Sequence, residues 1–134
     1  MGNENLKLRT RKFALNVVQL VESLPNGRTS EVLGRQLLRS GTSVGANYRA
    51  ACRAKSPADF IAKMGIVEEE ADESIFWMEM LVDAKKLPAE KAAPLLKEAN
   101  ELLSITIASI RTARGHSRSA SSNSALRTPH SALK

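Results

Sequence analysis

A run of carboxylates, Glu68-Glu69-Glu70-Ala71-Asp72-Glu73, is the first group of residues in this sequence that could carry chemistry. Glu69 and Glu73 are four residues apart and would share one face of a helix, where paired carboxylates in a bundle can hold metal ions. Such sites normally take histidine ligands as well, and both histidines, His116 and His130, lie in a polar C-terminal segment. We therefore interpret the run as a solvated or ion-paired face and expect no metal and no other cofactor.

Catalysis is not expected either. Cys52 is the single cysteine, and no histidine that could serve as its base lies in the apolar part of the chain. We expect Cys52 to pack as a small apolar residue. A bundle metalloprotein using Glu69, Glu73 and Glu79 is the remaining enzymatic hypothesis, and the missing histidines argue against it. The sequence thus predicts no catalytic residue.

Basic residues offer a different chemistry, the binding of phosphate. Residues 1–56 hold ten Lys or Arg against three acids, a net charge of +7, whereas residues 57–87 hold three against eight, a net charge of −5. Aromatic residues make up only 4% of the chain, so contacts to RNA or DNA would be made mainly to phosphate. The residues predicted to make them are Arg9, Arg11, Lys12, Arg35, Arg39, Arg49 and Arg53.

A solvated face is the simpler explanation for the N-terminal cations, Lys7 included, although together with Arg28, Arg35 and Arg39 they could form a phosphate-binding patch. The basic half and the acidic run should also attract each other, within one subunit or between subunits. If the two helices that carry them are antiparallel, Arg49 and Arg53 lie near the start of the acidic helix, and Arg35 and Arg39 lie nearer its end.

Helices must position all of these groups. The chain has 134 residues, of which 43% are hydrophobic, and strand-like alternation is absent, which predicts one all-α domain. A first helix is expected over about Leu6–Leu24, ending at Pro25-Asn26-Gly27. A second is expected over about Ser30–Arg53, capped by Thr29 or Ser30 and continuous through Gly41 and Gly45, where small residues would let another backbone approach.

Two further helices complete the pattern. Ser56-Pro57-Ala58-Asp59 is a strong helix start, followed by heptad-spaced apolar residues from Phe60 to about Lys86. The last helix is expected over about Ala89–Ala113, and Pro94 could kink or restart it. We predict an antiparallel up-and-down four-helix bundle over residues 1–114. Residues 115–134, rich in Ser and without acids, form a basic tail that is expected to be disordered and is best explained as a non-functional extension.

Two smaller groups have alternative roles. Phe76, Trp77 and Met80 lie beside the apolar stripe of the third helix and are the residues predicted to form a subunit interface, although a core position remains equally open for Trp77. Ser43 and Asn47 are one turn apart and could contact nucleic acid, but a structural role is favoured because mid-helix Ser and Asn usually bond a neighbouring backbone group.

The location expected from the sequence is the cytoplasm. The single cysteine excludes a disulfide framework within the chain, and the N-terminal segment lacks the features of a signal peptide. No apolar segment is long enough to span a bilayer, so no membrane contact is predicted.

With four helices outlined, several motifs resemble a known family. Gln36-Leu37-Leu38-Arg39, the segment from Ser43 to Arg49, and Glu70-Ala71-Asp72-Glu73 followed by Trp77 and Glu79 are similar to the central signature of the bacterial 23S rRNA intervening-sequence proteins. The resemblance covers about residues 8–113. It implies a four-helix bundle that assembles into a homopentamer and carries no catalytic residues. It also implies nucleic acid and a reverse transcriptase as partners, because related accessory proteins of diversity-generating retroelements bind both. The family often has a glutamate where this chain has Ala50, so any polar contact made by that glutamate is absent here.

The leading hypothesis is therefore a non-enzymatic, homo-oligomeric helical scaffold that binds RNA or DNA through basic helix surfaces. The alternative is a helix-turn-helix DNA-binding protein with a turn at Gly41, a cap at Thr42-Ser43, and Asn47, Arg49 and Arg53 on a recognition helix. The apolar spacing continues through Gly41, which argues against this alternative.

Overall fold

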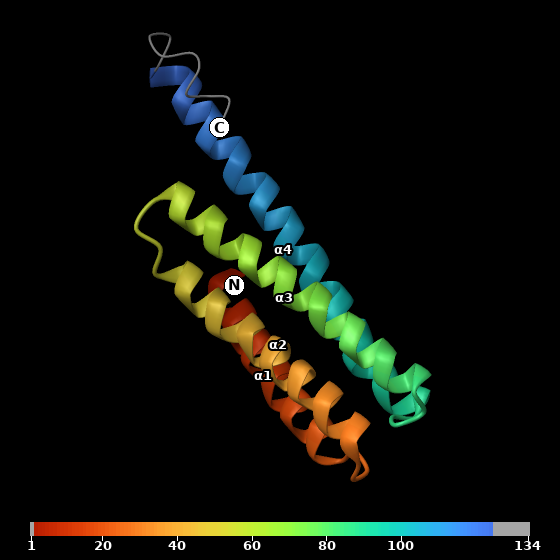
Figure 1. Cartoon of the computed structure of the whole chain (residues 1–134). Helices are drawn as coiled ribbons and strands as arrows, with labels where there is room; N and C mark the ends of the chain where they lie inside the picture. Colours follow the sequence, from red (N-terminus) through yellow and green to blue (C-terminus); the bar gives the residue numbers. More distant parts are fainter. Residues whose placement is uncertain (1, 125–134) are drawn as a thin grey trace.

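The structure, a computed structural model, describes residues 2–124 of the chain and the side chains of residues 5–116. It contains four helices: α1 (Gly2–Glu22), α2 (Arg28–Cys52), α3 (Pro57–Asp83) and α4 (Ala89–Ser124). Short turns join them, so that consecutive helices run in opposite directions (Figure 1). The predicted all-α, antiparallel up-and-down bundle is confirmed for the described residues.

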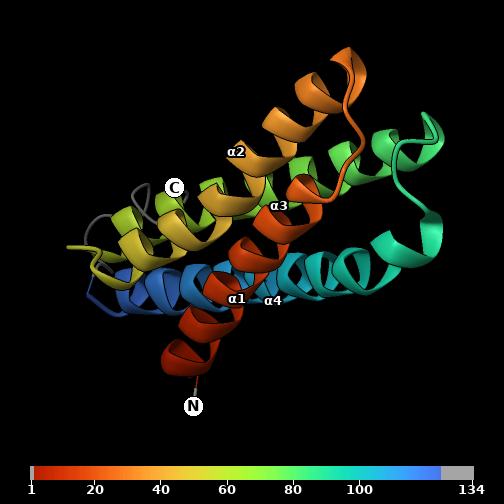
Figure 2. The same ribbon diagram turned by 90° about the horizontal axis from the view of Figure 1, so that it is seen from below.

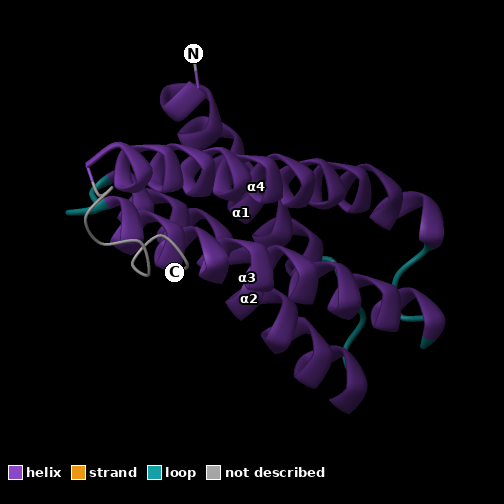
Figure 3. Cartoon of the chain, turned by 90° about the horizontal axis from the view of Figure 1, so that it is seen from above, coloured by secondary structure: helices purple, strands orange, loops and turns teal. Residues whose placement is uncertain are grey.

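The helices pack mainly in chain order, α1 on α2, α2 on α3 and α3 on α4. Contact between α1 and α4 is more limited, because α1 crosses α4 obliquely (Figure 2). No Cα atom of α1 comes within 8 Å of a Cα atom of α3 over the described residues, so these two helices lie at opposite corners of the bundle. Figure 3 shows the four helices from the other side, joined by short loops.

The start of α2 differs from the prediction of a Thr29 or Ser30 cap. The N-cap residue is Gly27, whose φ of 140° lies in a region that residues with a Cβ rarely adopt. Because this conformation turns the chain immediately, α2 begins at Arg28, ahead of the expected start. Ser30 is consequently buried within the first turn, and its Oγ has no hydrogen-bond partner among the described residues.

The start of α3 agrees with the sequence, whereas its end comes earlier than predicted. The Ser56 side chain accepts a hydrogen bond from the backbone N–H of Asp59 at 3.0 Å, with Pro57 at the first helical position. At the other end, Lys85 adopts a φ of 63°, and the N–H of Lys86 donates to the carbonyl of Leu81 at 2.9 Å. This left-handed turn closes the helix after Asp83, short of the predicted Lys86.

Helix α4 passes through Pro94 without a restart. The N–H that proline lacks would bond the carbonyl of Glu90, which lies in the exposed first turn, where solvent can take its place. The helix also continues beyond the expected Ala113, through Ser124. It thus includes residues 115–124 of the segment for which the composition predicts disorder, while residues 125–134 lie outside the described part of the chain.

The core follows the predicted heptad positions of α3, and α4 contributes buried residues at a similar spacing. From α3, Met64, Val67, Ala71, Met78 and Leu81 are buried, and from α4 Leu95, Ala99, Leu102, Thr106 and Ile110. Cys52 is half-buried and packs against this core, as expected. The spacing of about three and a half residues thus marks the buried face of both helices.

A buried polar contact joins α2 to α3. The Oγ of Ser74 donates to the Oγ of Ser40 at 3.1 Å, and the Oγ of Ser40 lies 3.3 Å from the carbonyl oxygen of Leu37, to which it donates. Both hydroxyls therefore have partners inside the core, which satisfies buried polar groups that would otherwise be unfavourable.

Candidate nucleic-acid interface

Four cations from two helices line one groove between α1 and α2. Lys7 and Arg11 are one turn apart on α1, and Arg49 and Arg53 are one turn apart on α2. The two helices run antiparallel, so the start of α1 lies beside the end of α2 and the four side chains meet at the same end of the bundle. The groove has a volume of about 500 Å³.

Small residues make this groove possible. A Cβ atom on Gly45 would lie 3.2 Å from the carbonyl oxygen of Thr10, so the backbones of α1 and α2 approach closely here. Ala14 and Ala46 line the groove beside Gly45. The prediction that the glycines of α2 allow another backbone to approach is therefore confirmed, and short side chains leave space between the two pairs of cations.

The charge of the groove is uncompensated by neighbouring carboxylates. None of its lining residues is Asp or Glu, and no ion pair of Lys7, Arg11, Arg49 or Arg53 is found among the described side chains. Like charges one helical turn apart repel each other weakly. An anion in the groove would relieve this repulsion, so the arrangement is suited to binding phosphate or another anion.

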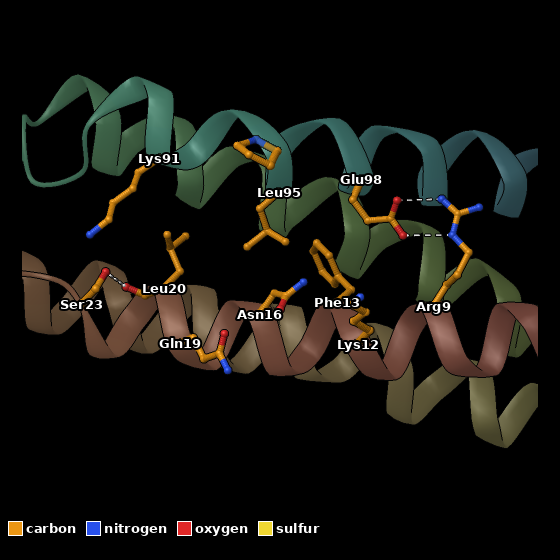
Figure 4. Close-up of a pocket in the computed structure, with 11 residues that line it drawn as sticks. Arg9, Lys12, Phe13, Asn16, Gln19, Leu20, Ser23, Lys91, Leu95 and Glu98 are labelled. Carbon is orange, nitrogen blue, oxygen red and sulfur yellow. Dashed lines mark hydrogen bonds and ion pairs between the residues drawn. The ribbon is translucent and has the colours of Figure 1, made fainter.

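Two of the other predicted cations are held by carboxylates. Arg9 makes a two-pronged contact with Glu98, with distances of 3.0 and 2.7 Å, and also reaches Glu101 at 3.0 Å. The hydrogen bonds that Arg9 donates to Glu98 are the main cause of a pKa of Arg9 above its ordinary value. Arg9 thus ties α1 to α4, as Figure 4 shows, and is less available to phosphate.

Arg39 plays the equivalent part between α2 and α3. Its guanidinium group pairs with Glu73 and lies 3.2 Å from Oε1 of Glu70. Hydrogen bonding to Glu70 is the main cause of a raised pKa of Arg39. The interpretation of the acidic run as an ion-paired face is confirmed for these two glutamates. Among the described side chains, no group of three or more His, Cys, Asp or Glu is placed to hold a metal ion.

The structure separates the remaining predicted cations from the basic groove. Arg35 lies 4.0 Å from Glu31 of its own helix and lines a hollow near the turn between α1 and α2, together with Glu22. Lys12 lines a groove of about 550 Å³ between α1 and α4, over a floor that includes Phe13 and Leu95 (Figure 4). That groove also contains Glu98, so its charge is mixed.

Of the seven predicted cations, the structure therefore brings together Arg11, Arg49 and Arg53. It adds Lys7, which the sequence analysis named as a neighbour but left out of the predicted set. The signal for Lys7 was its position four residues before Arg11, which places both on one side of α1. The sequence also placed Arg49 and Arg53 near the start of the acidic helix, as possible partners of its acids. They line the groove beside α1, and neither has an ion pair with α3 among the described side chains.

The helix-turn-helix alternative is wrong for this chain. Helix α2 is unbroken from Arg28 to Cys52, so no turn occurs at Gly41. Asn47 is half-buried and donates a hydrogen bond to the carbonyl of Ser43 at 2.8 Å. The structural role favoured for Asn47 is thus confirmed.

Three apolar residues of α3 were proposed as a subunit interface. Phe76 is 50% exposed and Met80 is 37% exposed, whereas Trp77 is half-buried and packs against the core. The Trp77 indole N–H donates to Glu73 at 3.4 Å, and its ring meets that of Phe76 edge-on, with centroids 4.9 Å apart. Trp77 thus anchors the patch to the core, and Phe76 and Met80 form its exposed part.

None of the helices in the described part of the chain is long and apolar enough to cross a membrane.

The model of the family of 23S rRNA-intervening sequence proteins matches residues 5–108. A search of curated proteins found no match. The crystal structure of a protein of unknown function from the S23 ribosomal protein family of Bacteroides thetaiotaomicron is similar, with 35% sequence identity and a TM-score of 0.78. The similarity covers 83% of this chain and 99% of that one. The chain therefore belongs to the family of 23S rRNA-intervening sequence proteins.

Proposed function

We propose that this protein is a non-enzymatic helical scaffold that binds the phosphate backbone of RNA or DNA in the groove between α1 and α2. The observation that carries the proposal is the convergence of Lys7, Arg11, Arg49 and Arg53 on a groove without a lining carboxylate. If four cations stood together only to keep the protein soluble, acids beside them would reduce their mutual repulsion. No acid lines this groove. Phosphate is the common anion that a row of guanidinium and ammonium groups binds.

The lining of the groove also favours binding that is independent of base sequence. No aromatic residue lines it, so it offers no ring on which a base could stack. Its lining side chains include no histidine or carboxylate that could act as a general base, which supports a binding role over a catalytic one. Affinity should therefore come from phosphate contacts and fall steeply with salt.

Two paired variants test the groove. Arg49→Gln combined with Arg53→Gln removes two groove charges, and Lys97→Gln combined with Arg111→Gln removes two exposed charges of α4 that line none of the three hollows described above. Fluorescence anisotropy with a labelled single-stranded RNA and a labelled DNA duplex measures affinity across a salt series. Circular dichroism verifies that both variants fold.

The groove variant should bind at least about tenfold more weakly, and the slope of log affinity against log salt should decrease by about two. The α4 variant should change both quantities much less. Equal losses in the two variants would mean that net charge alone attracts nucleic acid, and an unchanged affinity in the groove variant would exclude the groove.

Self-association is the second part of the proposed scaffold role. Phe76 and Met80 form an exposed apolar patch on the outer face of α3, which supports contact with another subunit. The molecular mass in solution, measured by light scattering, tests this part, and a strict monomer would contradict it. The assembly of five subunits and the reverse-transcriptase partner stay predictions from the family resemblance. The cytoplasmic location stays a prediction from the sequence.

A further inference from the structure

The turn between α1 and α2 carries an exposed Asn-Gly pair at one end of the bundle (Figure 1). Asn26 is followed by Gly27, and no other Asn of the sequence precedes a glycine. The amide of an asparagine is chemically labile, because the backbone nitrogen of the next residue can attack it. Glycine hinders this attack least, since it has no Cβ atom.

The two groups that would react are not held by hydrogen bonds. Neither the N–H of Gly27 nor the side-chain amide of Asn26 has a hydrogen-bond partner among the described residues. Asn16 gives the contrast, because it lies inside α1. The N–H of Val17, which follows it, belongs to the hydrogen-bonded helix, and the branched side chain of Val17 hinders attack further.

The start of α2 favours the anion that this attack needs. A base must first remove the proton of the Gly27 amide, which leaves negative charge on the nitrogen. The charged side chains around the turn are Glu22 of α1 with Arg28, Glu31 and Arg35 of α2, two acids and two arginines, so their charges balance. The positive end of the α2 dipole, which has no side-chain cap at Gly27, therefore decides the local electrostatics.

We propose that Asn26 is a site of spontaneous deamidation in the folded protein. The deprotonated nitrogen of Gly27 forms a bond to Cγ of Asn26, the bond between Cγ and Nδ2 breaks, and the amide group leaves with a proton as ammonia. Water then opens the resulting succinimide ring at one of the two bonds to the Gly27 nitrogen. Cleavage at Cγ gives aspartate at position 26, and cleavage at the backbone carbonyl carbon gives isoaspartate, in which the main chain runs through Cγ.

Both products change the turn. Each adds a negative charge next to the start of α2, where the helix dipole favours it. Isoaspartate also lengthens the main chain by a carbon atom. The chain returns tightly here, because a Cβ atom on Gly34 of α2 would lie 3.1 Å from Cδ1 of Leu24, just before the turn. The isoaspartate form should therefore be less stable than the aspartate form.

The full chain contains both the test site and its control in a single tryptic peptide. Trypsin cleaves after Lys12 and Arg28, so the peptide of residues 13–28 includes Asn16 and Asn26. The folded protein is incubated at neutral and at mildly alkaline pH and then digested, and a sample taken at the start corrects for change during digestion. Tandem mass spectrometry locates the mass increase caused by replacing NH2 with OH. A methyltransferase specific for isoaspartate distinguishes the two products.

Asn26 should lose its amide at least about tenfold faster than Asn16, a ratio that needs only a small difference in activation free energy. The rate at Asn26 should increase with pH, because base generates the attacking nitrogen. Unfolding in urea should accelerate the reaction at Asn16 much more than at Asn26, since only Asn16 is followed by an N–H that loses a helical hydrogen bond. Asn26→Gln keeps an amide but needs a larger ring, so this variant should form no isoaspartate at position 26.

Two other results would overturn the proposal. If Asn26 of the folded protein keeps its amide as long as Asn16 does, the conformation of the turn prevents the attack, and rapid loss only after unfolding has the same meaning. If the Asn26→Gln variant forms as much isoaspartate as the unaltered chain, the reaction takes place at a different residue. Circular dichroism verifies that the variant and the incubated protein are folded.

Discussion

Gly41 of α2 lies directly against Val17 of α1, so that a Cβ atom on Gly41 would fall 2.8 Å from both Cγ methyl groups of Val17. Val17 is fully buried, and its branched side chain has little freedom to move aside. The glycine thus sets the distance between the two helices that form the basic groove. A residue that weakens an isolated helix is here required by packing.

Substitution of Gly41 by alanine should therefore destabilise the protein. Overpacking typically lowers the free energy of unfolding by about 1 to 3 kcal/mol, and the better helix propensity of alanine raises it by only about 1 kcal/mol. Gly65 of α3 is the matched control, because no atom lies within 4 Å of its added Cβ. In urea unfolding, Gly41→Ala should lower the free energy of unfolding while Gly65→Ala raises it by up to about 1 kcal/mol. A stabilised Gly41→Ala variant would show that α1 moves away without penalty.

The start of α3 should give stability a dependence on acid pH through Asp59. The hydrogen bond from the Lys63 ammonium group, followed by that from the backbone N–H of Lys55, holds the pKa of Asp59 below its ordinary value of 3.8. Folding therefore favours the ionised carboxylate. Its contribution is fully present above the ordinary pKa and is lost as the pH falls through the lowered pKa of the folded state.

Urea midpoints of the unaltered chain and of Asp59→Asn measure this effect across a pH series. The difference between them should be constant near neutral pH and should shrink as the pH falls below about 4. Lys63→Gln removes the main cause of the lowered pKa, so in that background the Asp59→Asn substitution should show a smaller pH dependence. A difference that widens toward acid pH would have the wrong sign for this mechanism.

Sequence reasoning succeeded where the evidence is local and repeated. The heptad spacing from Met64 to Leu81 identified the buried face of α3, and Ser56 was recognised as its cap because the capping residues are adjacent in sequence. It failed at the start of α2, where the φ of Gly27 decides the first turn and no side-chain signal reports that angle. The first residue of α2 therefore depends on a backbone angle, and the identity of the neighbouring residues does not determine that angle.

The candidate site was harder to predict because the availability of a cation depends on distant partners. Arg9 is held by Glu98, which is 89 positions away in the chain, and nothing near Arg9 indicates this. Arg53 also has no acid within four positions in the sequence, yet it meets no carboxylate among the described side chains. Only the packing of the helices decides which arginines remain available for phosphate.

The difference between a groove arginine and an ion-paired arginine predicts that two single substitutions on α2 affect different properties, nucleic-acid binding in one case and stability in the other. Arg53→Gln removes a groove cation and should reduce the slope of log affinity for nucleic acid against log salt by about one, with little effect on stability. Arg39→Gln removes the partner of Glu70 and Glu73, so it should lower the free energy of unfolding by about 0 to 1 kcal/mol and reduce the slope much less. Anisotropy titrations across a salt series and urea unfolding measure the two quantities on the same preparations. Because both variants lose one positive charge, equal decreases in slope would show that binding responds to net charge and not to the position of the arginine in the groove.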